Sequence, residues 1–215
     1  MHYKTICLDY DGTIHDSIKI YYKAFLKAYS YLVETGYQPK RDWSKDEVKL
    51  FLGQNPKEMW ESFKPSIPEE VIQVASKMIG EDMTNSIRNG EGSLFDGALD
   101  MLKYLKDKGY YLIYLSNSKN YYMEMNKKAF NLDLYFDEFI VSEMYNYVPK
   151  KEILTSIKNR LPQPILMVGD RIHDMESGIY NNIDTVACLY GYGKPHEFEG
   201  TTYQINDIKD LTKIL

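Results

Sequence analysis

Cysteine is scarce in this sequence, and its scarcity excludes several classes of protein. Only Cys7 and Cys188 are present among 215 residues, and they lie in apolar runs far apart along the chain. A disulfide-stabilised secreted scaffold needs a denser framework, and no Cys and His spacing typical of a zinc site occurs. We therefore expect two buried free thiols in a reducing compartment.

Long hydrophobic runs and an excess of basic residues are also missing. No segment approaches the roughly 20 consecutive apolar residues of a membrane-spanning helix. The 26 lysines and arginines are outnumbered by 31 acidic residues, so the basic surface typical of nucleic-acid binding is not expected. Asp9 follows the first residues too closely to leave room for a secretory signal. A cytoplasmic protein with neither a membrane nor a nucleic acid as partner is expected.

Apolar segments of strand length alternate with helical patterns near the start of the chain and again after residue 90. The strand-like segments are 3–8, 110–115, 139–141, 164–168 and 185–189. Strands that alternate with helices of about 10–15 residues predict a parallel sheet with right-handed crossovers. The expected fold class is therefore α/β, with a Rossmann-like parallel sheet as its core.

The sequence between residues 16 and 89 contains no convincing strand. Apolar residues recur there with helical spacing, and Ser66-Ile67-Pro68-Glu69 has the pattern of a capping box before a helix. These features predict an all-helical cap, residues 16–89, inserted after the first strand of a core formed by residues 1–15 and 90–215. The loop Gly53-Gln54-Asn55-Pro56 either reaches the substrate or only connects two helices.

Three of the predicted strands end in clusters of polar residues. These clusters are Asp9-Tyr10-Asp11-Gly12-Thr13, Ser116-Asn117-Ser118 and Gly169-Asp170-Arg171-Ile172-His173-Asp174. Ligands of open α/β sheets bind in the crevice outside the carboxyl ends of the strands. We therefore expect the three clusters to meet, although they are far apart in sequence.

Four aspartates, Asp9, Asp11, Asp170 and Asp174, would then share one crevice. Two like charges about 4 Å apart repel by roughly 4 kcal/mol at an effective dielectric constant of about 20, so such a cluster is expected to hold a cation. Oxygen ligands of this kind suit Mg²⁺. Asp9 and Asp11 leave an extended segment on the same side, so one can attack a phosphoryl group while the other handles protons.

These motifs resemble those of the haloacid dehalogenase (HAD) superfamily, specifically its helical-cap group of phosphoglycolate-phosphatase-like enzymes. Residues 9–13 fit the first motif of that family, Asp-x-Asp-Gly-Thr, residues 115–117 fit the second, and residues 169–174 fit the fourth. Lys150 best fits the third motif, a lysine at the start of a helix, and Lys151 is a close alternative. The resemblance spans nearly the whole core and is weakest in the cap.

The resemblance implies a phosphoric monoester hydrolase that acts on a small phosphorylated metabolite through an aspartyl-phosphate. Asp9 would be the nucleophile, and Asp11 would be the acid/base. Ser116 would hold a phosphoryl oxygen by its hydroxyl, with help from the backbone N–H of Asn117. Lys150 would offset the charge of the phosphoryl group and of Asp9.

The same resemblance implies a Mg²⁺ ion as the cofactor. Its ligands would be Asp9, the backbone carbonyl of Asp11, Asp170 and Asp174, the last either directly or through water. Arg171 and His173 are expected at the surface or behind these ligands rather than in the reaction itself.

Three other functions stay open at this stage. A phosphomutase uses the same core and returns the phosphoryl group to a sugar. A phosphonatase carries a Schiff-base lysine in its cap, where Lys19 and Lys23 lie. A regulatory or binding protein could keep the scaffold without catalysis. A dehalogenase is disfavoured, because the dehalogenases that this chain resembles lack the second aspartate, here Asp11.

Overall fold

The computed structural model describes residues 3–54 and 56–215, with the side chains of residues 56–58 left out. Met1, His2 and Asn55 lie outside the described residues. The loop Gly53-Gln54-Asn55-Pro56, which either reaches the substrate or only connects two helices, is therefore described only in part.

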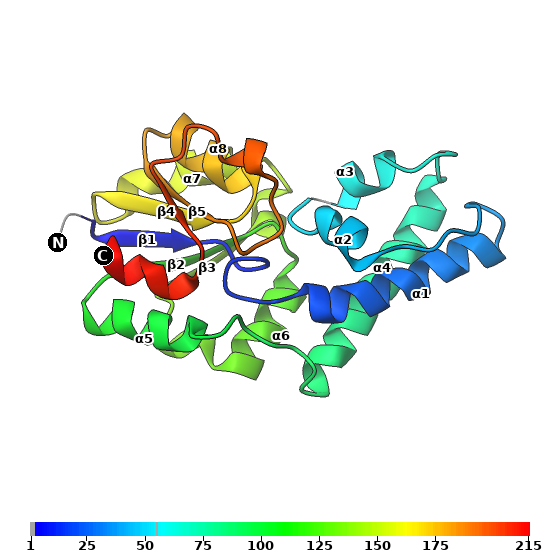
Figure 1. Ribbon diagram of the computed structural model, residues 1–215, viewed down its shortest axis with the longest axis horizontal. Helices are drawn as coiled ribbons and strands as arrows, with labels where there is room; N and C mark the ends of the chain where they lie inside the picture. The colour runs from blue at the N-terminus through cyan, green and yellow to red at the C-terminus, as the bar shows by residue number, and fades with distance from the viewer. Residues whose placement is uncertain (1–2, 55) are drawn as a thin grey trace.

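A parallel six-stranded sheet forms the centre of the larger part of the molecule (Figure 1). Its strands are β1 (Thr5–Leu8), β2 (Tyr111–Ser116), β3 (Glu138–Val141), β4 (Ile165–Gly169), β5 (Asp184–Cys188) and β6 (Tyr203–Ile205). They lie in the order β3-β2-β1-β4-β5-β6, and each neighbouring pair is parallel. The predicted α/β class with a parallel sheet is confirmed, whereas β6 is a strand that the sequence did not reveal.

Helices cover both faces of the sheet, as Figure 1 shows. One face is covered by α5 (Ala98–Asp107) and α6 (Asn120–Phe130), and the other by α7 (Lys150–Ile157) and α8 (Ile172–Tyr180). Ile6 and Leu8 pack in the same buried cluster as Leu102 of α5, whereas Cys7 between them packs with Leu154 of α7. Successive side chains of a strand point to opposite faces, so a strand buried on both faces is apolar throughout.

Short 3₁₀ helices complete the core. They are η2 (Leu132–Leu134), η3 (Ser142–Tyr145), η4 (Lys158–Arg160), η5 (Pro195–Phe198) and η6 (Ile208–Lys213). None of the described helices is long and apolar enough to cross a lipid bilayer.

The regular elements described in the segment between β1 and α5 are all helices, and loops connect them. The segment contains α1 (Ile18–Glu34), α2 (Lys45–Val48), η1 (Lys49–Phe51), α3 (Pro56–Glu61) and α4 (Glu69–Arg88). The long helices α1 and α4 pack side by side, and the segment lies beside the core at the end to which β1 points (Figure 1). An aromatic cluster stabilises it, in which the ring of Phe25 lies 5.2 Å from that of Trp43.

The prediction of a capping box at the start of α4 is wrong. The residue that precedes the helix is Pro68, in an extended conformation, and no side chain caps it. Proline disfavours a helical conformation of the residue before it. Ile67 therefore cannot begin the helix behind Ser66, and the first turn starts at Glu69.

Two connections join the helical segment to the core, and they run alongside each other. The Asp16 N–H donates to the Ser93 carbonyl at 2.9 Å, and the Phe95 N–H donates to the Ile14 carbonyl at the same distance. The paired connections bring the segment's entry and exit to one place. A boundary between residues 15 and 16 and between residues 89 and 90 stays a prediction.

Candidate active site

The register of the sheet brings the polar clusters together. Leu8 of β1 lies beside Tyr114 of β2 and beside Val168 of β4. Asp9 follows Leu8 directly, Ser116 is the last residue of β2, and Asp170 follows β4. The three strands therefore end at nearly the same level, and the residues after them face the helical segment.

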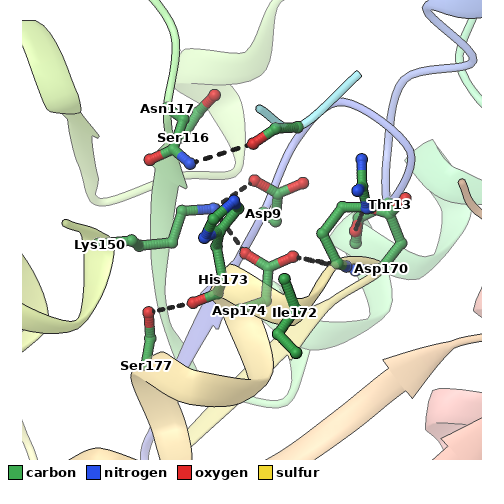
Figure 2. A network of polar contacts seen from close by, with 12 residues as sticks. Asp9, Thr13, Ser116, Asn117, Lys150, Asp170, Ile172, His173, Asp174 and Ser177 are labelled. Carbon is green, nitrogen blue, oxygen red and sulfur yellow. Dashed lines mark hydrogen bonds and ion pairs between the residues drawn. The ribbon is translucent and has the colours of Figure 1, made fainter. Parts of the chain in front are cut away.

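Three buried carboxylates form the centre of the site (Figure 2). Asp9, Asp170 and Asp174 each offer an oxygen atom, and these atoms lie within 4.8 Å of one another. Asp9 comes from the end of β1, Asp170 from the loop after β4, and Asp174 from the first turn of α8. All three belong to the residues that the sequence proposed as metal ligands.

Lys150 joins two of these carboxylates. Its Nζ lies 2.6 Å from Asp9 Oδ1 and 2.5 Å from Asp174 Oδ1, and its side chain is almost fully buried. Lys150 is the first residue of α7, so the helix start places it at the edge of the site. Lys151, the other candidate, points instead to the surface, where its Nζ lies 3.8 Å from Glu176.

Backbone groups fix Asp170 and Asp174 in place. Asp170 Oδ2 accepts a 2.7 Å hydrogen bond from the Tyr192 N–H. Asp174 Oδ2 accepts hydrogen bonds from the N–H groups of Asp170 at 3.1 Å and Arg171 at 3.0 Å. A side chain at Gly12 would overlap the carboxylate, since its Cβ would lie 2.2 Å from Asp170 Oδ2. The glycine is required because the loop approaches Asp170 so closely.

The site carries more negative charge than Lys150 neutralises. Burial, helped by the nearby Asp174 carboxylate, raises the pKa of Asp9 to about 7 even though Lys150 opposes the shift. Burial, with Asp9 and Asp174 close by, also raises the pKa of Asp170 well above its ordinary range. Burial alone would lower the pKa of Lys150, but the Asp174 and Asp9 carboxylates together hold it above its usual value.

This donor set fits a hard divalent cation. Oxygen atoms from several clustered carboxylates are the ligands that Mg²⁺ and similar ions take in proteins. A cation there would offset the repulsion that raises the pKa values of Asp9 and Asp170. The described residues within the cluster offer no thiol or imidazole ligand.

Asp11 is oriented differently from the other three aspartates. Its Oδ1 accepts a 2.8 Å hydrogen bond from the Tyr122 hydroxyl and lies 3.1 Å from His15 Nδ1. Burial, together with the negative charge of Asp11, raises the pKa of Tyr122 well above its ordinary value, so the phenol keeps its proton. The Asp11 side chain therefore lies outside the carboxylate cluster while still lining the same cavity.

Ser116 and Asn117 lie at the end of β2, as expected. Ser116 is buried, and its Oγ accepts a 3.2 Å hydrogen bond from the Ser118 N–H. The Asn117 side-chain amide donates to the Gly53 carbonyl at 3.3 Å, which connects the core to the helical segment. Figure 2 shows both residues on the far side of Asp9 from Asp170.

A cavity of about 180 Å³ lies between these residues and the helical segment. Asp9, Asp11, Ser116 and Lys150 line its core side. Ligand pockets for drug-sized molecules are larger, roughly 300–1,000 Å³, so this one suits a small molecule. Lys19 and Lys23, the candidates for a Schiff-base lysine, are not among the described residues that line it and instead form ion pairs with Asp16 and Glu91.

Arg171 and Tyr122 are the residues whose place in the site the sequence did not reveal. Arg171 is buried, and its guanidinium donates to the carbonyls of Leu52 and Leu50 in the helical segment and to Glu197 Oε2. Tyr122 lies within the amphipathic helix α6, where its spacing resembles that of an ordinary core residue. Tyr122 does not stand at a strand end. Arg171 belongs to the polar cluster that follows β4, but no sequence pattern indicated that its side chain would reach the helical segment.

Comparison with known proteins agrees with this geometry. The family model of haloacid dehalogenase-like hydrolases matches residues 6–188, which is most of the chain. The chain belongs to that family. The expected class, a phosphatase of the HAD type acting on phosphoric monoesters, is thereby confirmed.

Named relatives and solved structures resemble the chain over nearly its whole length. Pyrophosphatase PpaX from Bacillus mycoides is 24% identical over 100% of this chain and 98% of its own. A phosphoglycolate phosphatase from Aquifex aeolicus is 27% identical over 99% of this chain and 96% of its own. A hydrolase of the haloacid dehalogenase-like family from Streptococcus pneumoniae superimposes with a TM-score of 0.80, at 19% identity, over 99% of this chain and 98% of its own. At that identity the superposition shows the fold alone.

Proposed function

We propose that this HAD phosphatase is Mg²⁺-dependent and hydrolyses a small phosphorylated metabolite through an aspartyl-phosphate on Asp9. The observation that carries the proposal is the separation of two neighbouring carboxylates. Asp9 lies in the buried cluster with Lys150, whereas Asp11 faces the same cavity from outside that cluster. Two carboxylates in different surroundings can take two different roles in one reaction.

Asp9 performs the first half of the reaction together with Asp11. A carboxylate oxygen of Asp9 forms a bond to phosphorus as the bond from phosphorus to the leaving oxygen breaks. Asp11 gives its proton to that leaving oxygen, so the product departs as a neutral alcohol. The Tyr122 hydroxyl holds the Asp11 carboxyl in position.

The second half of the reaction restores Asp9. Asp11, now ionised, takes a proton from a water molecule, and the water oxygen attacks phosphorus while the bond to Asp9 breaks. Inorganic phosphate leaves, and both carboxyl groups return to their starting states. The Ser116 hydroxyl and the Lys150 ammonium stabilise the charge on the phosphoryl oxygens in both steps.

The metal and the helical segment have supporting roles. Mg²⁺ would be held by Asp9, Asp170, Asp174 and the Asp11 carbonyl, and it would supply positive charge next to the phosphoryl oxygens. Residues 16–89 act as a cap over the core formed by residues 1–15 and 90–215, and they exclude water from the cavity. The cavity wall that the cap contributes contacts the leaving group.

The proposal is tested by phosphate release from p-nitrophenyl phosphate with Mg²⁺ and with a chelator. We expect turnover with Mg²⁺, none with the chelator, and a loss of at least about a thousandfold in the Asp9→Asn protein. A covalent phosphate trapped on the wild-type chain when turnover is stopped with acid, removed by mild base and absent from Asp9→Asn, would identify the intermediate. Residual turnover near wild type in Asp9→Asn would contradict the proposed nucleophile.

Folded protein with no turnover in several metals would favour a binding role, and transfer to a sugar instead of water would indicate a phosphomutase.

A further inference from the structure

Apolar side chains form most of the described cap side of the cavity. The cap contributes Phe51, Leu52, Met59, Trp60, Ile79 and Met83 to the lining. Among the described residues of the cap that line the cavity, none carries a charge. The phosphoryl end of the cavity, formed by the core, is by contrast rich in charged groups.

Two of the polar side chains on this wall are directed at cap neighbours. The Trp60 indole N–H donates a 2.8 Å hydrogen bond to Ser76 Oγ. The Tyr21 hydroxyl donates to the Met59 sulfur at 3.0 Å. These two donors are used within the cap, and the other polar side chains of the described wall, Gln54 and Ser76, are uncharged. The described wall therefore offers no counter-charge to an anionic group.

The basic side chains that line the cavity come from the core, and the buried ones are already occupied. Lys150 is held between Asp9 and Asp174. Arg171 donates to Glu197 and to the Leu52 carbonyl. Lys119 is exposed and directly precedes α6, at the rim of the cavity.

A second anionic group on a substrate would be costly against this wall. Moving a charged group from water into apolar surroundings is strongly unfavourable unless it gains a partner of opposite charge. An apolar group in the same place would instead gain by leaving water, in proportion to the area it buries. The cap wall therefore discriminates between leaving groups by their charge.

We infer that the natural substrate is a phosphate monoester whose leaving alcohol is small, uncharged and mainly apolar. This inference rests on the proposed function, because it assumes that the phosphoryl group binds beside Asp9. Two relatives are named after pyrophosphate and phosphoglycolate. The parts of those compounds beyond the transferred phosphoryl group are anionic, so the inference excludes both as the natural substrate of this chain.

The decisive experiment compares benzyl phosphate with 2-phosphoglycolate on the full-length protein with Mg²⁺. Both esters release a primary alcohol, so the comparison reports how the cap accepts the group beyond it, an apolar ring in one ester and a carboxylate in the other. We expect kcat/KM to be at least about tenfold higher for benzyl phosphate than for 2-phosphoglycolate, and higher than for pyrophosphate as well. Equal or better turnover of either anionic compound would overturn the inference.

A substitution pair tests whether the wall itself is responsible. Met83→Lys places a cation among the apolar residues, and we expect it to shift the preference toward 2-phosphoglycolate by about tenfold or more. Val74→Lys is the matched control, because Val74 lies on the same helix α4 but is 43% exposed. A shift of equal size in the control, or no shift in folded Met83→Lys, would mean that the wall does not select the substrate.

The two proposals fail in distinguishable ways. Acetyl phosphate reacts without a demanding alcohol leaving group, so its Mg²⁺-dependent hydrolysis, abolished in Asp9→Asn, reports on the proposed function alone. Loss of that reaction would contradict the proposed function. If the protein hydrolyses acetyl phosphate but prefers esters with anionic leaving groups, only the inferred substrate class is contradicted. The comparison of substrates on the wild-type protein decides the matter even if Met83→Lys does not fold.

Discussion

The Tyr122 hydroxyl of α6 donates a 2.8 Å hydrogen bond to Asp11 Oδ1 in the loop that follows β1. His15 Nδ1 lies 3.1 Å from the same carboxylate oxygen and 3.1 Å from the Tyr122 oxygen. The contact keeps the Asp11 carboxyl apart from Asp9 and the other buried carboxylates. In the proposed mechanism, this position lets the Asp11 carboxyl exchange a proton with the leaving group while only its backbone carbonyl would bind the metal ion.

Tyr122→Phe should reduce turnover most for substrates with poor leaving groups. Without the hydroxyl, Asp11 is less well oriented. A hydrogen bond to the charge that develops on Asp11 as it gives up its proton contributes about 1.5–3 kcal/mol, or about tenfold or more in rate. An alkyl phosphate needs the proton from Asp11, whereas p-nitrophenolate leaves without it. We expect at least about a tenfold loss for butyl phosphate and a much smaller loss for p-nitrophenyl phosphate.

Tyr110→Phe is the control for that prediction. Tyr110 directly precedes β2, at the end of that strand opposite to the site, and its hydroxyl donates to the Leu215 carbonyl. The substitution should leave the ratio of the two rates unchanged. Equal losses on both substrates in Tyr122→Phe would indicate a general structural effect instead of positioning of Asp11.

Lys150→Met should harm both catalysis and stability. Its ammonium is the buried cation between Asp9 and Asp174, and removal of one partner from a buried ion pair typically costs about 3–5 kcal/mol of unfolding free energy. The loss of charge stabilisation should lower kcat by about a hundredfold or more. Urea denaturation without metal and steady-state kinetics with Mg²⁺ measure the two effects separately.

Lys151→Met provides the matched control for the lysine. Its side chain is at the surface, 3.8 Å from Glu176, so the unfolding free energy should change by no more than about 0.5 kcal/mol. Activity should stay near wild type. A large catalytic loss in Lys151→Met with little effect in Lys150→Met would reverse the assignment of the active-site lysine.

Mg²⁺ should stabilise the protein more at pH 8 than at pH 5.5. The pKa of Asp9 rises from 3.8 to about 7 in the folded metal-free protein. A carboxyl whose pKa is raised on folding makes the folded state less stable as the pH increases from about 4 to about 7. Metal ligands must be deprotonated, so bound Mg²⁺ restores stability over that same range.

Thermal unfolding with and without Mg²⁺ measures this effect. At a free Mg²⁺ concentration about 100 times Kd, binding adds about 2.7 kcal/mol, which corresponds to a rise in Tm of about 5–10 °C. Asp170→Asn should reduce that rise sharply. A Tm increase that is equal at both pH values, or that survives in Asp170→Asn, would show that the ion binds elsewhere.

Arg171→Lys should raise KM more than it lowers kcat. The planar guanidinium bonds to Glu197 and to the carbonyls of Leu50 and Leu52 at once, and a lysine ammonium cannot reproduce that arrangement. A cap loop that is less well held weakens substrate binding in the ground state and the transition state alike. We expect KM to increase by about tenfold, with kcat changed by less than about threefold.

Arg160→Lys is a matched substitution away from the cavity. Arg160 forms a two-point contact with Glu138, which is the first residue of β3, so the same exchange there should leave KM unchanged.

The rise in Tm caused by Mg²⁺ should stay the same in Arg171→Lys. A lower metal response would indicate that Arg171 acts on Asp170 and Asp174 instead of on the cap.

Local sequence patterns predicted the elements whose own residues form a strong apolar pattern. The apolar segments of β1, β2 and β4 are strongly patterned because both faces of the sheet are buried. β6 was missed because it is short and two of its three residues are exposed, so no apolar run marks it. The sequence pattern predicts a start of α4 at Ser66 with Pro68 in the first turn, whereas Pro68 precedes the helix and keeps Ile67 out of it.

The sequence by itself determined the α/β fold and the chemical groups at the strand ends, because apolar periodicity and short motifs act over a few neighbouring residues. Only the tertiary structure decided how those groups meet. The register of β1 with β2 and β4 sets the level of Asp9, Ser116 and Asp170, and the packing of α6 directs Tyr122 onto Asp11. These contacts join residues more than 100 positions apart, so their geometry depends on how whole elements pack.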